Sequence, residues 1–228
     1  MTGSTAAAGV TGVILAGGKS SRMGSNKALL PYRGGRFIEA IHRQLAGLFD
    51  EVLVVTNTPE QYTFLGCRMV SDIYQDMGAL AGLHAGLVNC RTPHMFAVAC
   101  DMPYLNDSLI RALVTRRHRA DVIIPESDDG LEPLHAVYCR SCLHAMETAL
   151  KAQKRRLVSF FPEIRVMIVP GTTVRFVDPD LDSFRNINTP ADYYNLREGE
   201  REGCKDSQTN HTTAISGGEY QLNLSARL

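Results

Sequence analysis

The stretch VTGVILAGGKSSRMGSNK, residues 10–27, joins an apolar run to a loop rich in glycine and positive charge. Its first part, Val10–Ala16, has the β-branched and apolar content of a buried strand. The loop that follows carries Lys19, Arg22 and Lys27 among glycine residues. In open α/β sheets, ligands bind at the carboxyl ends of the strands, where glycine-rich backbone and cations hold phosphate oxygens. The stretch therefore predicts a polyphosphate site.

The loop also contains Gly18-Lys19-Ser20, which looks like the end of a P-loop. The P-loop signature requires a glycine five residues before this triplet, and that position is Val13. Gly12 lies one residue too early, and no glycine pair in the stretch has the GxGxxG spacing of a dinucleotide-binding loop. The sequence thus argues against both standard nucleotide motifs.

Short β-branched runs alternate with amphipathic segments along the next hundred residues. Helical spacing is clear at Ile38, Ile41, Leu45 and Leu48, which recur every three or four residues. The alternation predicts a Rossmann-like three-layer α/β sandwich, with a mostly parallel twisted sheet and helices on both faces. The expected strands are Val10–Ala16, Glu51–Thr56, His94–Cys100 and Asp121–Pro125, and the expected helices are Phe37–Leu48, Leu80–Val88 and Ser108–Arg117.

The pattern changes after residue 125. The turn signal Asp128-Asp129-Gly130 and the apolar run Leu134–Cys139 predict a small antiparallel addition to the sheet. Thr189-Pro190 reads as a helix start, and Asn186-Ile187-Asn188 is expected to end a strand before it. We expect a flexible N-terminus over residues 1–9, one domain over 10–197 and a disordered tail over 198–228, where polar residues dominate.

Composition sets further limits. A chain of 228 residues with 44% apolar content can bury one sizeable core. Lys+Arg and Asp+Glu number 24 each, so no basic excess indicates a nucleic-acid partner. The sequence has no apolar run long enough to span a membrane and no signal-peptide pattern, which favours a cytoplasmic location. Six scattered cysteines are expected to be reduced thiols, and the CxxC of Cys139 and Cys142 has no second pair to complete a zinc site.

Longer motifs carry a resemblance to a known family. The run LAGGKSSRMGSNKALLP, residues 15–31, resembles the LAGG-x-S-x-R-M-G-x-x-K signature of nucleotidyltransferases, and is most similar to that of the molybdenum cofactor guanylyltransferases. The resemblance covers residues 10 to 197. Further matching motifs follow in order: Val55-Thr56-Asn57, Ser71-Asp72, Gly78-Ala79-Leu80-Ala81-Gly82, Ala99-Cys100-Asp101-Met102-Pro103, Glu132-Pro133-Leu134 and Asn186-Ile187-Asn188-Thr189-Pro190.

The resemblance implies roles at the phosphates of GTP. Arg22 and Lys27 bind phosphate and stabilise charge as pyrophosphate leaves, and Asp101 holds Mg²⁺ as the cofactor. Asp101 follows the apolar run MFAVAC, so its carboxylate is expected at the same edge as the loop. The plainer alternatives are solvated loop cations for Arg22 and Lys27, and a turn aspartate for Asp101.

The resemblance also implies a guanine-side set and an acceptor-side set. Asp72 is expected to read the base, since a carboxylate accepts from guanine N1–H and its exocyclic amine, although Asp76 remains an alternative. On the acceptor side, Arg156 (or Arg155) and His135 are expected to act together with Asn186 and Asn188. The competing interpretation of the two asparagines is hydrogen bonding within a turn. The guanine-side set is Leu15, Ala16, Gly17, Gly18, Asn57 and Asp72, and the acceptor-side set is Arg156, His135, Asn186 and Asn188.

The implied reaction joins GMP from GTP to molybdopterin and releases pyrophosphate. The molybdopterin phosphate attacks the α-phosphorus in line and is already ionised, so no protein base is needed. Transient contacts with molybdenum-insertion and molybdoenzyme-maturation proteins are implied as well. The alternatives are a cytidylyltransferase or another small-molecule nucleotidyltransferase, and a GTP-binding regulator that kept the fold.

Overall fold

A computed structural model describes residues 8–17, 26–189 and 191–194 of the chain. The chain divides into one compact unit that ends at Thr189 and a second that starts at Pro190. Of the second unit, residues 191–194 are described, and they are helical, in keeping with the helix start expected there. The flexible segment 1–9 and the disordered tail 198–228 stay predictions, because all of the tail and residues 1–7 lie outside the described residues.

The first unit is built on one sheet of eight strands. Its main path runs in the order β10-β7-β9-β6-β1-β4-β5, and β8 pairs with β7. All strands of this path except β9 point the same way, which confirms the expected mostly parallel sheet. The strands are β1 (Val10–Leu15), β4 (Val52–Val55), β5 (Arg68–Val70), β6 (His94–Ala99), β7 (Val122–Ser127), β8 (Gly130–Leu131), β9 (His135–Cys139) and β10 (Val166–Val169).

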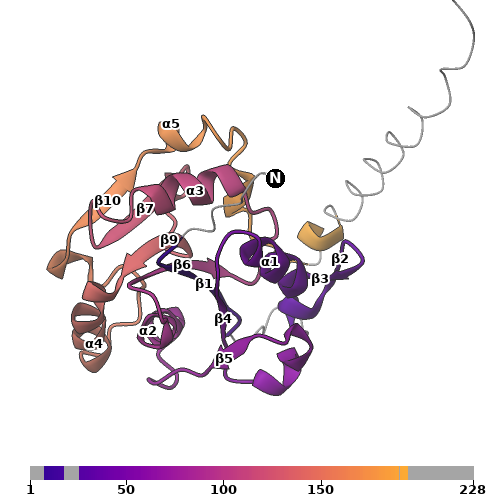
Figure 1. Cartoon of the computed structure of the whole chain (residues 1–228), viewed down its shortest axis with the longest axis horizontal. Coiled ribbons are helices and arrows are strands. Elements are labelled where there is room, and N and C mark those ends of the chain that lie inside the picture. The colour runs from indigo at the N-terminus through magenta and orange to yellow at the C-terminus, as the bar shows by residue number, and fades with distance from the viewer. Residues whose placement is uncertain (1–7, 18–25, 190, 195–228) are drawn as a thin grey trace, which may run out of the picture. The chain divides into compact units, whose positions relative to one another are not determined.

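Helices cover both faces of this sheet, as Figure 1 shows. On one face α1 (Phe37–Ala46), α3 (Asp107–Thr115) and the short α5 (Gly171–Val174) share one buried apolar cluster with the strands. On the other face α2 (Ala79–Asn89) and α4 (Leu143–Lys151) share a second cluster. Within the described residues, 3₁₀ turns form at η1 (Lys27–Leu29), η2 (Pro59–Leu65), η3 (Arg140–Cys142), η4 (Phe161–Glu163) and η5 (Asp182–Phe184). The expected three-layer sandwich is confirmed.

The apolar patterns explain how the helices pack. α1 buries Ile38, Ile41 and Leu45 on one stripe, as its spacing predicts. α2 is buried on all sides from Leu80 to Leu87, because it packs against the strands below it, against α4 beside it and, at His84, against the ring of Tyr74. Its close approach to the sheet depends on glycine: a Cβ at Gly86 would lie 2.8 Å from Val13 Cγ1 of β1. The helix therefore sits directly against the central strand.

The antiparallel addition has two parts. β9 runs between β6 and β7, antiparallel to both. β7 and β8 form a hairpin whose turn is Asp128-Asp129, with Gly130 at φ 112°. A separate two-stranded ribbon, β2 (Pro31–Tyr32) with β3 (Gly35–Arg36), precedes α1. The expectation of a strand before Asn186 is wrong: η5 precedes it, and residues 185–188 have no regular structure.

Candidate active site at the carboxyl edge of the sheet

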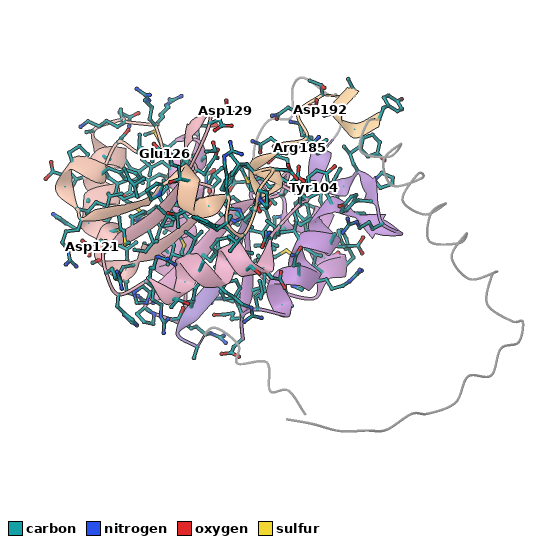
Figure 2. The ribbon with its side chains drawn as sticks, turned by 90° about the horizontal axis from the view of Figure 1, so that it is seen from above. Tyr104, Asp121, Glu126, Asp129, Arg185 and Asp192 are labelled. Atoms are coloured by element: carbon teal, nitrogen blue, oxygen red, sulfur yellow. The ribbon has the colours of Figure 1, made fainter. Side chains whose placement is uncertain are left out.

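The candidate site follows from the position of β1. This strand lies between β4 on one side and β6 on the other, so the later strands of the sheet are added on both sides of it. Such a switch point leaves a crevice for ligands above the strand ends. Figure 2 shows Asp121 at the amino end of β7, with Glu126 and Asp129 toward the opposite edge, where Tyr104 and Arg185 also lie. The guanidinium of Arg185 stacks on the Tyr104 ring at 5.3 Å.

Lys27 and Asp101 meet at this edge, as the sequence predicts. The Nζ atom of Lys27 lies 3.9 Å from Oδ2 of Asp101, and the two side chains are 16% and 24% exposed. Lys27 Nζ also donates a hydrogen bond to Oδ1 of Asn188 at 2.7 Å. The structure thus joins Lys27 of the phosphate loop, Asp101 of the turn after β6 and Asn188 of the acceptor-side set.

The electrostatics of Asp101 reflect its partial burial. Burial raises the pKa of this carboxyl group, and the nearby Lys27 ammonium lowers it. The adjacent Cys100 is partly buried, and burial of its thiol together with the negative charge of Asp101 raises its pKa to about 12. Cys100 is therefore a neutral neighbour, and Lys27 supplies the positive charge beside Asp101.

The Lys27 end of the loop is fixed by Asn26, a residue that sequence reasoning missed. The Asn26 side chain accepts a hydrogen bond from Ala28 N–H at 3.2 Å and caps η1. Its amide nitrogen donates to the hydroxyl of Tyr62 and to Gln61 Oε1, both at 2.7 Å. An asparagine before a short apolar turn is a capping signal that would have identified it. Asn26 thus ties the Lys27 turn to η2.

Asn57 and Asp72 form the other end of the candidate site. Asn57 Nδ2 donates to Asp72 Oδ2 at 2.9 Å, and Asn57 Oδ1 accepts from the Asp72 N–H at 3.0 Å. Burial raises the pKa of Asp72, and the hydrogen bond from Asn57 lowers it. A Cβ at Gly82 would lie 2.8 Å from the Leu15 side chain and 3.5 Å from Asp72 Oδ1, so α2 closes tightly over this corner.

Asp76, the alternative to Asp72, lies elsewhere. It is exposed and has a positive φ of 58°, in the turn before α2. The structure therefore brings Asp72, rather than Asp76, to Asn57. Asp72 and Asp101 follow β5 and β6, which are three strand spacings apart, so they stand on the order of 14 Å from each other along the edge.

The backbone between these two ends belongs to Leu15, Ala16 and Gly17. Leu15 and Ala16 are buried, while Gly17 is exposed. The Leu15 carbonyl accepts from Cys100 N–H at 3.1 Å, and Ala16 N–H donates to the Val55 carbonyl at 2.9 Å. The phosphate-loop predictions for Gly18 and Arg22 lie outside the described residues.

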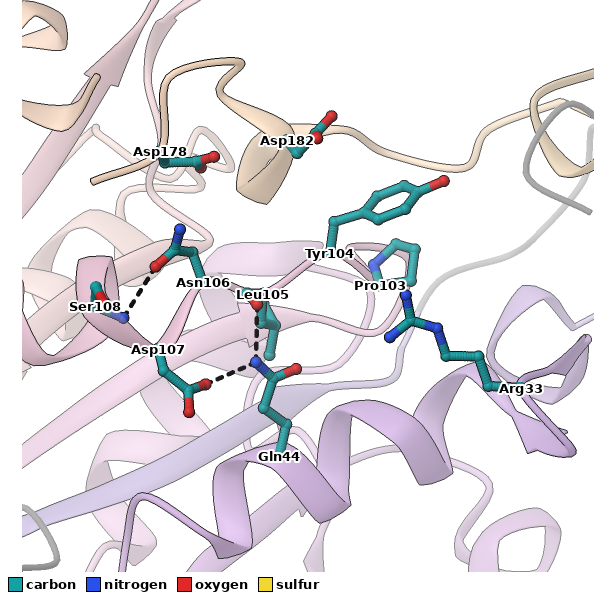
Figure 3. A pocket seen from close by; sticks show the side chains of 10 residues that line it. All are labelled: Arg33, Gln44, Pro103, Tyr104, Leu105, Asn106, Asp107, Ser108, Asp178 and Asp182. Carbon is teal, nitrogen blue, oxygen red and sulfur yellow. Dashed lines mark hydrogen bonds between the residues drawn. The ribbon is translucent and has the colours of Figure 1, made fainter. Parts of the chain in front are cut away.

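Two hollows open near the site. The smaller, of about 400 Å³, is lined by Asn186 and Asn188 together with Phe184, Arg185, Leu181, Asp180 and the β7–β8 turn. The larger, of about 610 Å³, lies over the start of α3, where Asn106 caps the helix and Gln44 bonds both Leu105 and Asp107 (Figure 3). Because Asn188 also contacts Lys27, the smaller hollow adjoins the Lys27–Asp101 pair.

His135 is not on the wall of either hollow, contrary to its place in the acceptor-side set. Its side chain has no exposed surface and lies between the rings of Phe96 and Phe184, at centroid distances of 5.1 and 5.3 Å. Neither ring nitrogen has a hydrogen-bond partner among the described residues, and burial lowers the pKa of His135 to about 3. In this structure it is a neutral core residue, because β9 points it inward.

The remaining sequence candidates stand apart from the pair. Arg155 and Arg156 are exposed in the connection after α4, and neither side chain forms an ion pair with a described residue. Cys139 and Cys142 are free thiols at the end of β9 and in η3, as are the three other cysteines of the described ranges. Burial raises the pKa of Cys142 to about 12, so it is an unreactive thiol.

Within residues 8–17, 26–189 and 191–194, no group of three or more His, Cys, Asp or Glu side chains is placed to hold a metal ion. None of the helices in these ranges has the length and apolar character needed to cross a membrane.

Comparison with known proteins gives consistent results. The profile of the MobA-like NTP transferase domain matches residues 12–164. A molybdenum cofactor guanylyltransferase of Desulfosudis oleivorans is 37% identical over 182 residues, which cover 79% of this chain and 90% of that protein. One of Syntrophotalea carbinolica is 36% identical over 187 residues, covering 81% and 89%.

Solved structures agree with these relatives. The molybdopterin-guanine dinucleotide biosynthesis protein A of Archaeoglobus fulgidus superposes with a TM-score of 0.73 at 26% identity, covering 86% of this chain and 99% of that one. A nucleotidyl transferase of Methanothermobacter shares the fold with a TM-score of 0.63 at 21% identity, covering 86% and 99%. The chain therefore belongs to the molybdenum cofactor guanylyltransferase family of MobA-like NTP transferases.

Proposed function

We propose that this enzyme transfers GMP from GTP to the phosphate of molybdopterin and releases pyrophosphate. The observation that carries the proposal is the pair of Lys27 and Asp101, 3.9 Å apart at the switch point of the sheet. The chain's family is the second support, because its relatives are named for this activity. The site has the parts that nucleotidyl transfer requires: a base-side corner, a phosphate side and an adjoining acceptor hollow.

The base-side corner suits guanine. The reciprocal hydrogen bonds of Asn57 fix the Asp72 carboxylate, leaving lone pairs of its oxygens for a ligand. A carboxylate accepts from both N1–H and the exocyclic amine of guanine, a pair of donors that cytosine lacks. Backbone groups of Leu15, Ala16 and Gly17 complete the proposed nucleotide contacts.

On the phosphate side, Lys27 is the proposed charge stabiliser. Its ammonium group has three donors, one of which goes to Asn188. The others can bind phosphate oxygens and offset the negative charge that builds as pyrophosphate leaves. Arg22 and the glycine backbone from Gly17 onward are proposed to share this role, on the strength of the sequence signature.

Asp101 suits Mg²⁺ by its chemistry. Its carboxylate supplies hard oxygen donors at the edge where the phosphates would lie, and no cluster of further ligands surrounds it among the described residues. Mg²⁺ usually takes one or two protein carboxylates and completes its shell with phosphate oxygens and water, so one aspartate fits. When bound, the ion would neutralise charge on the transferring phosphates.

The acceptor is proposed to enter the hollow lined by Asn186 and Asn188. Their amides offer both donors and acceptors, which suit the edge of a pterin or its phosphate. The attacking phosphate is ionised at neutral pH, so the enzyme works by positioning and charge neutralisation rather than by a protein base. Action in the cytoplasm, with transient contacts to molybdenum-insertion and molybdoenzyme-maturation proteins, is part of the same proposal and rests on the resemblance.

The test is pyrophosphate release by the purified enzyme with Mg²⁺ and molybdopterin. GTP, CTP, ATP and UTP are compared at equal concentration, and we expect release with GTP alone. Preference for CTP would keep the phosphate chemistry and overturn the role of Asp72. Binding of GTP without release in the presence of the acceptor would favour a regulator that kept the fold.

A further inference from the structure

Asn188 contacts the phosphate side of the site, although the sequence motifs place it with the acceptor. Its Oδ1 accepts the 2.7 Å hydrogen bond from Lys27 Nζ, across 161 positions of the chain. An ammonium group has donors only, so the amide atom that faces it must be the oxygen. The preceding Ile187 donates its N–H to the Asp101 carbonyl at 3.0 Å. Residues 187 and 188 therefore touch both Lys27 and Asp101.

Lys27 and Asp101 are close but do not form a hydrogen-bonded ion pair. Their charged atoms are 3.9 Å apart, whereas a charge-assisted N–H···O bond measures about 2.7–2.9 Å. Both side chains are mostly buried, so solvent screens their attraction only in part. This attraction favours closure of the gap. The hydrogen bond to Asn188 holds the ammonium in a position where the gap stays open.

We infer that Asn188 is a positioning residue that keeps the Lys27 ammonium away from Asp101, so that each charge stays available to substrate. The inference rests on the proposed function. If Lys27 closed onto Asp101, the two charges would neutralise each other. Phosphate oxygens would then compete with a carboxylate for Lys27, and a metal ion would compete with an ammonium for Asp101. With Asn188 in place, neither competition has to be overcome when GTP binds.

The side chain of Asn188 stands at both proposed substrate sites, that of GTP and that of the acceptor. Asn188 lines the 400 Å³ hollow with Asn186, yet its oxygen serves Lys27. The amide nitrogen of Asn186, by contrast, faces the Phe184 carbonyl at 3.4 Å. The two asparagines share a residue type and a hollow and differ in the Lys27 contact, so Asn186 provides a matched control.

A double-mutant cycle tests the inference. GTP affinity is measured by calorimetry with Mg²⁺ and without acceptor, for the wild type, Asn188→Ala, Lys27→Ala and the double variant. We expect Asn188→Ala to weaken GTP binding about tenfold and to raise the Mg²⁺ concentration needed for half-saturation. In the Lys27→Ala background the same change should alter GTP affinity less than about twofold, because Asn188 acts through Lys27.

The controls separate the possible failures. Asn186→Ala should leave GTP affinity within about twofold of the wild type. Asn188→Ser replaces Asn188→Ala if the melting temperature of the alanine variant falls. Unchanged affinity in both Asn188 variants, or equal losses in the two Lys27 backgrounds, would overturn the inference while wild-type GTP binding remains. Absence of GTP binding by the wild type would instead overturn the proposed function, and the inference with it.

Discussion

The burial of His135 leads to a prediction that distinguishes a role for this residue in the core from a role in the acceptor site. The side chain is enclosed by the rings of Phe96 and Phe184, and neither of its nitrogens has a hydrogen-bond partner among the described residues. We consider the replacement His135→Leu, which is apolar and close to histidine in volume. It should leave stability at pH 7 unchanged or raise it, because two unpaired buried polar atoms are removed.

The magnitude follows from the shift in pKa. Burial lowers the pKa of His135 to about 3 in the folded protein, against about 6.5 for an unfolded chain. The unfolded state therefore takes up the proton first, and the stability contributed by neutral His135 is lost as pH falls from about 6.5 toward 3. Between pH 7 and pH 5 the loss from this one group is about 2 kcal/mol. His135→Leu should remove this part of the pH dependence.

The assay is urea unfolding followed by circular dichroism at pH 7, 6 and 5, with the wild type and variant in parallel. His144→Leu, which replaces an exposed histidine on α4, is the matched control. Parallel stability curves for the wild type and His135→Leu would refute the reasoning. A large increase in the acceptor KM of His135→Leu, with stability unchanged, would return His135 to the acceptor site.

Four further outcomes are expected. Lys27→Ala should lower kcat by about 10²-fold or more, through loss of one charge stabiliser, and unchanged turnover would remove Lys27 from the mechanism. Asp101→Asn should lower the rate and shift the Mg²⁺ titration to higher concentration, while the melting temperature holds or rises, since a partly buried charge is removed; a wild-type titration would contradict the metal role. Asp72→Asn should reduce the preference for GTP over CTP by roughly tenfold or more, measured as the ratio of kcat/KM values, and an unchanged ratio would exclude Asp72 as the base reader. Gly86→Ala should lower the melting temperature by roughly 2–4 °C for each kcal/mol lost, because the new Cβ would lie 2.8 Å from Val13 Cγ1, and an unchanged melting temperature would mean that α2 shifts freely.

The sequence by itself determined five of the strands, the helices α1, α2 and α3, and the edge where they place the site, whereas β5, β10 and α4 were not predicted from it. The three- and four-residue spacing of Ile38, Ile41 and Leu45 predicted α1, and the β-branched run at Val10 predicted the central strand. Such periodicity depends on local side-chain direction, so it can be read without knowing the partners. Because Lys27 and Asp101 follow predicted strands or their loops, their meeting at one edge was predictable too.

The tertiary structure alone decided which residues touch. Because β9 is inserted between β6 and β7, the side chain of His135 lies in the core. Its position after Pro133-Leu134 in the sequence had placed it in a binding motif. The two hydrogen bonds between Asn57 and Asp72 distinguish Asp72 from the alternative, Asp76. The 2.7 Å hydrogen bond between Lys27 and Asn188 connects residues 161 positions apart in the sequence. These contacts depend on strand order and on the path of irregular segments. Both are set by the packing of the whole unit, and no local pattern in the chain encodes them.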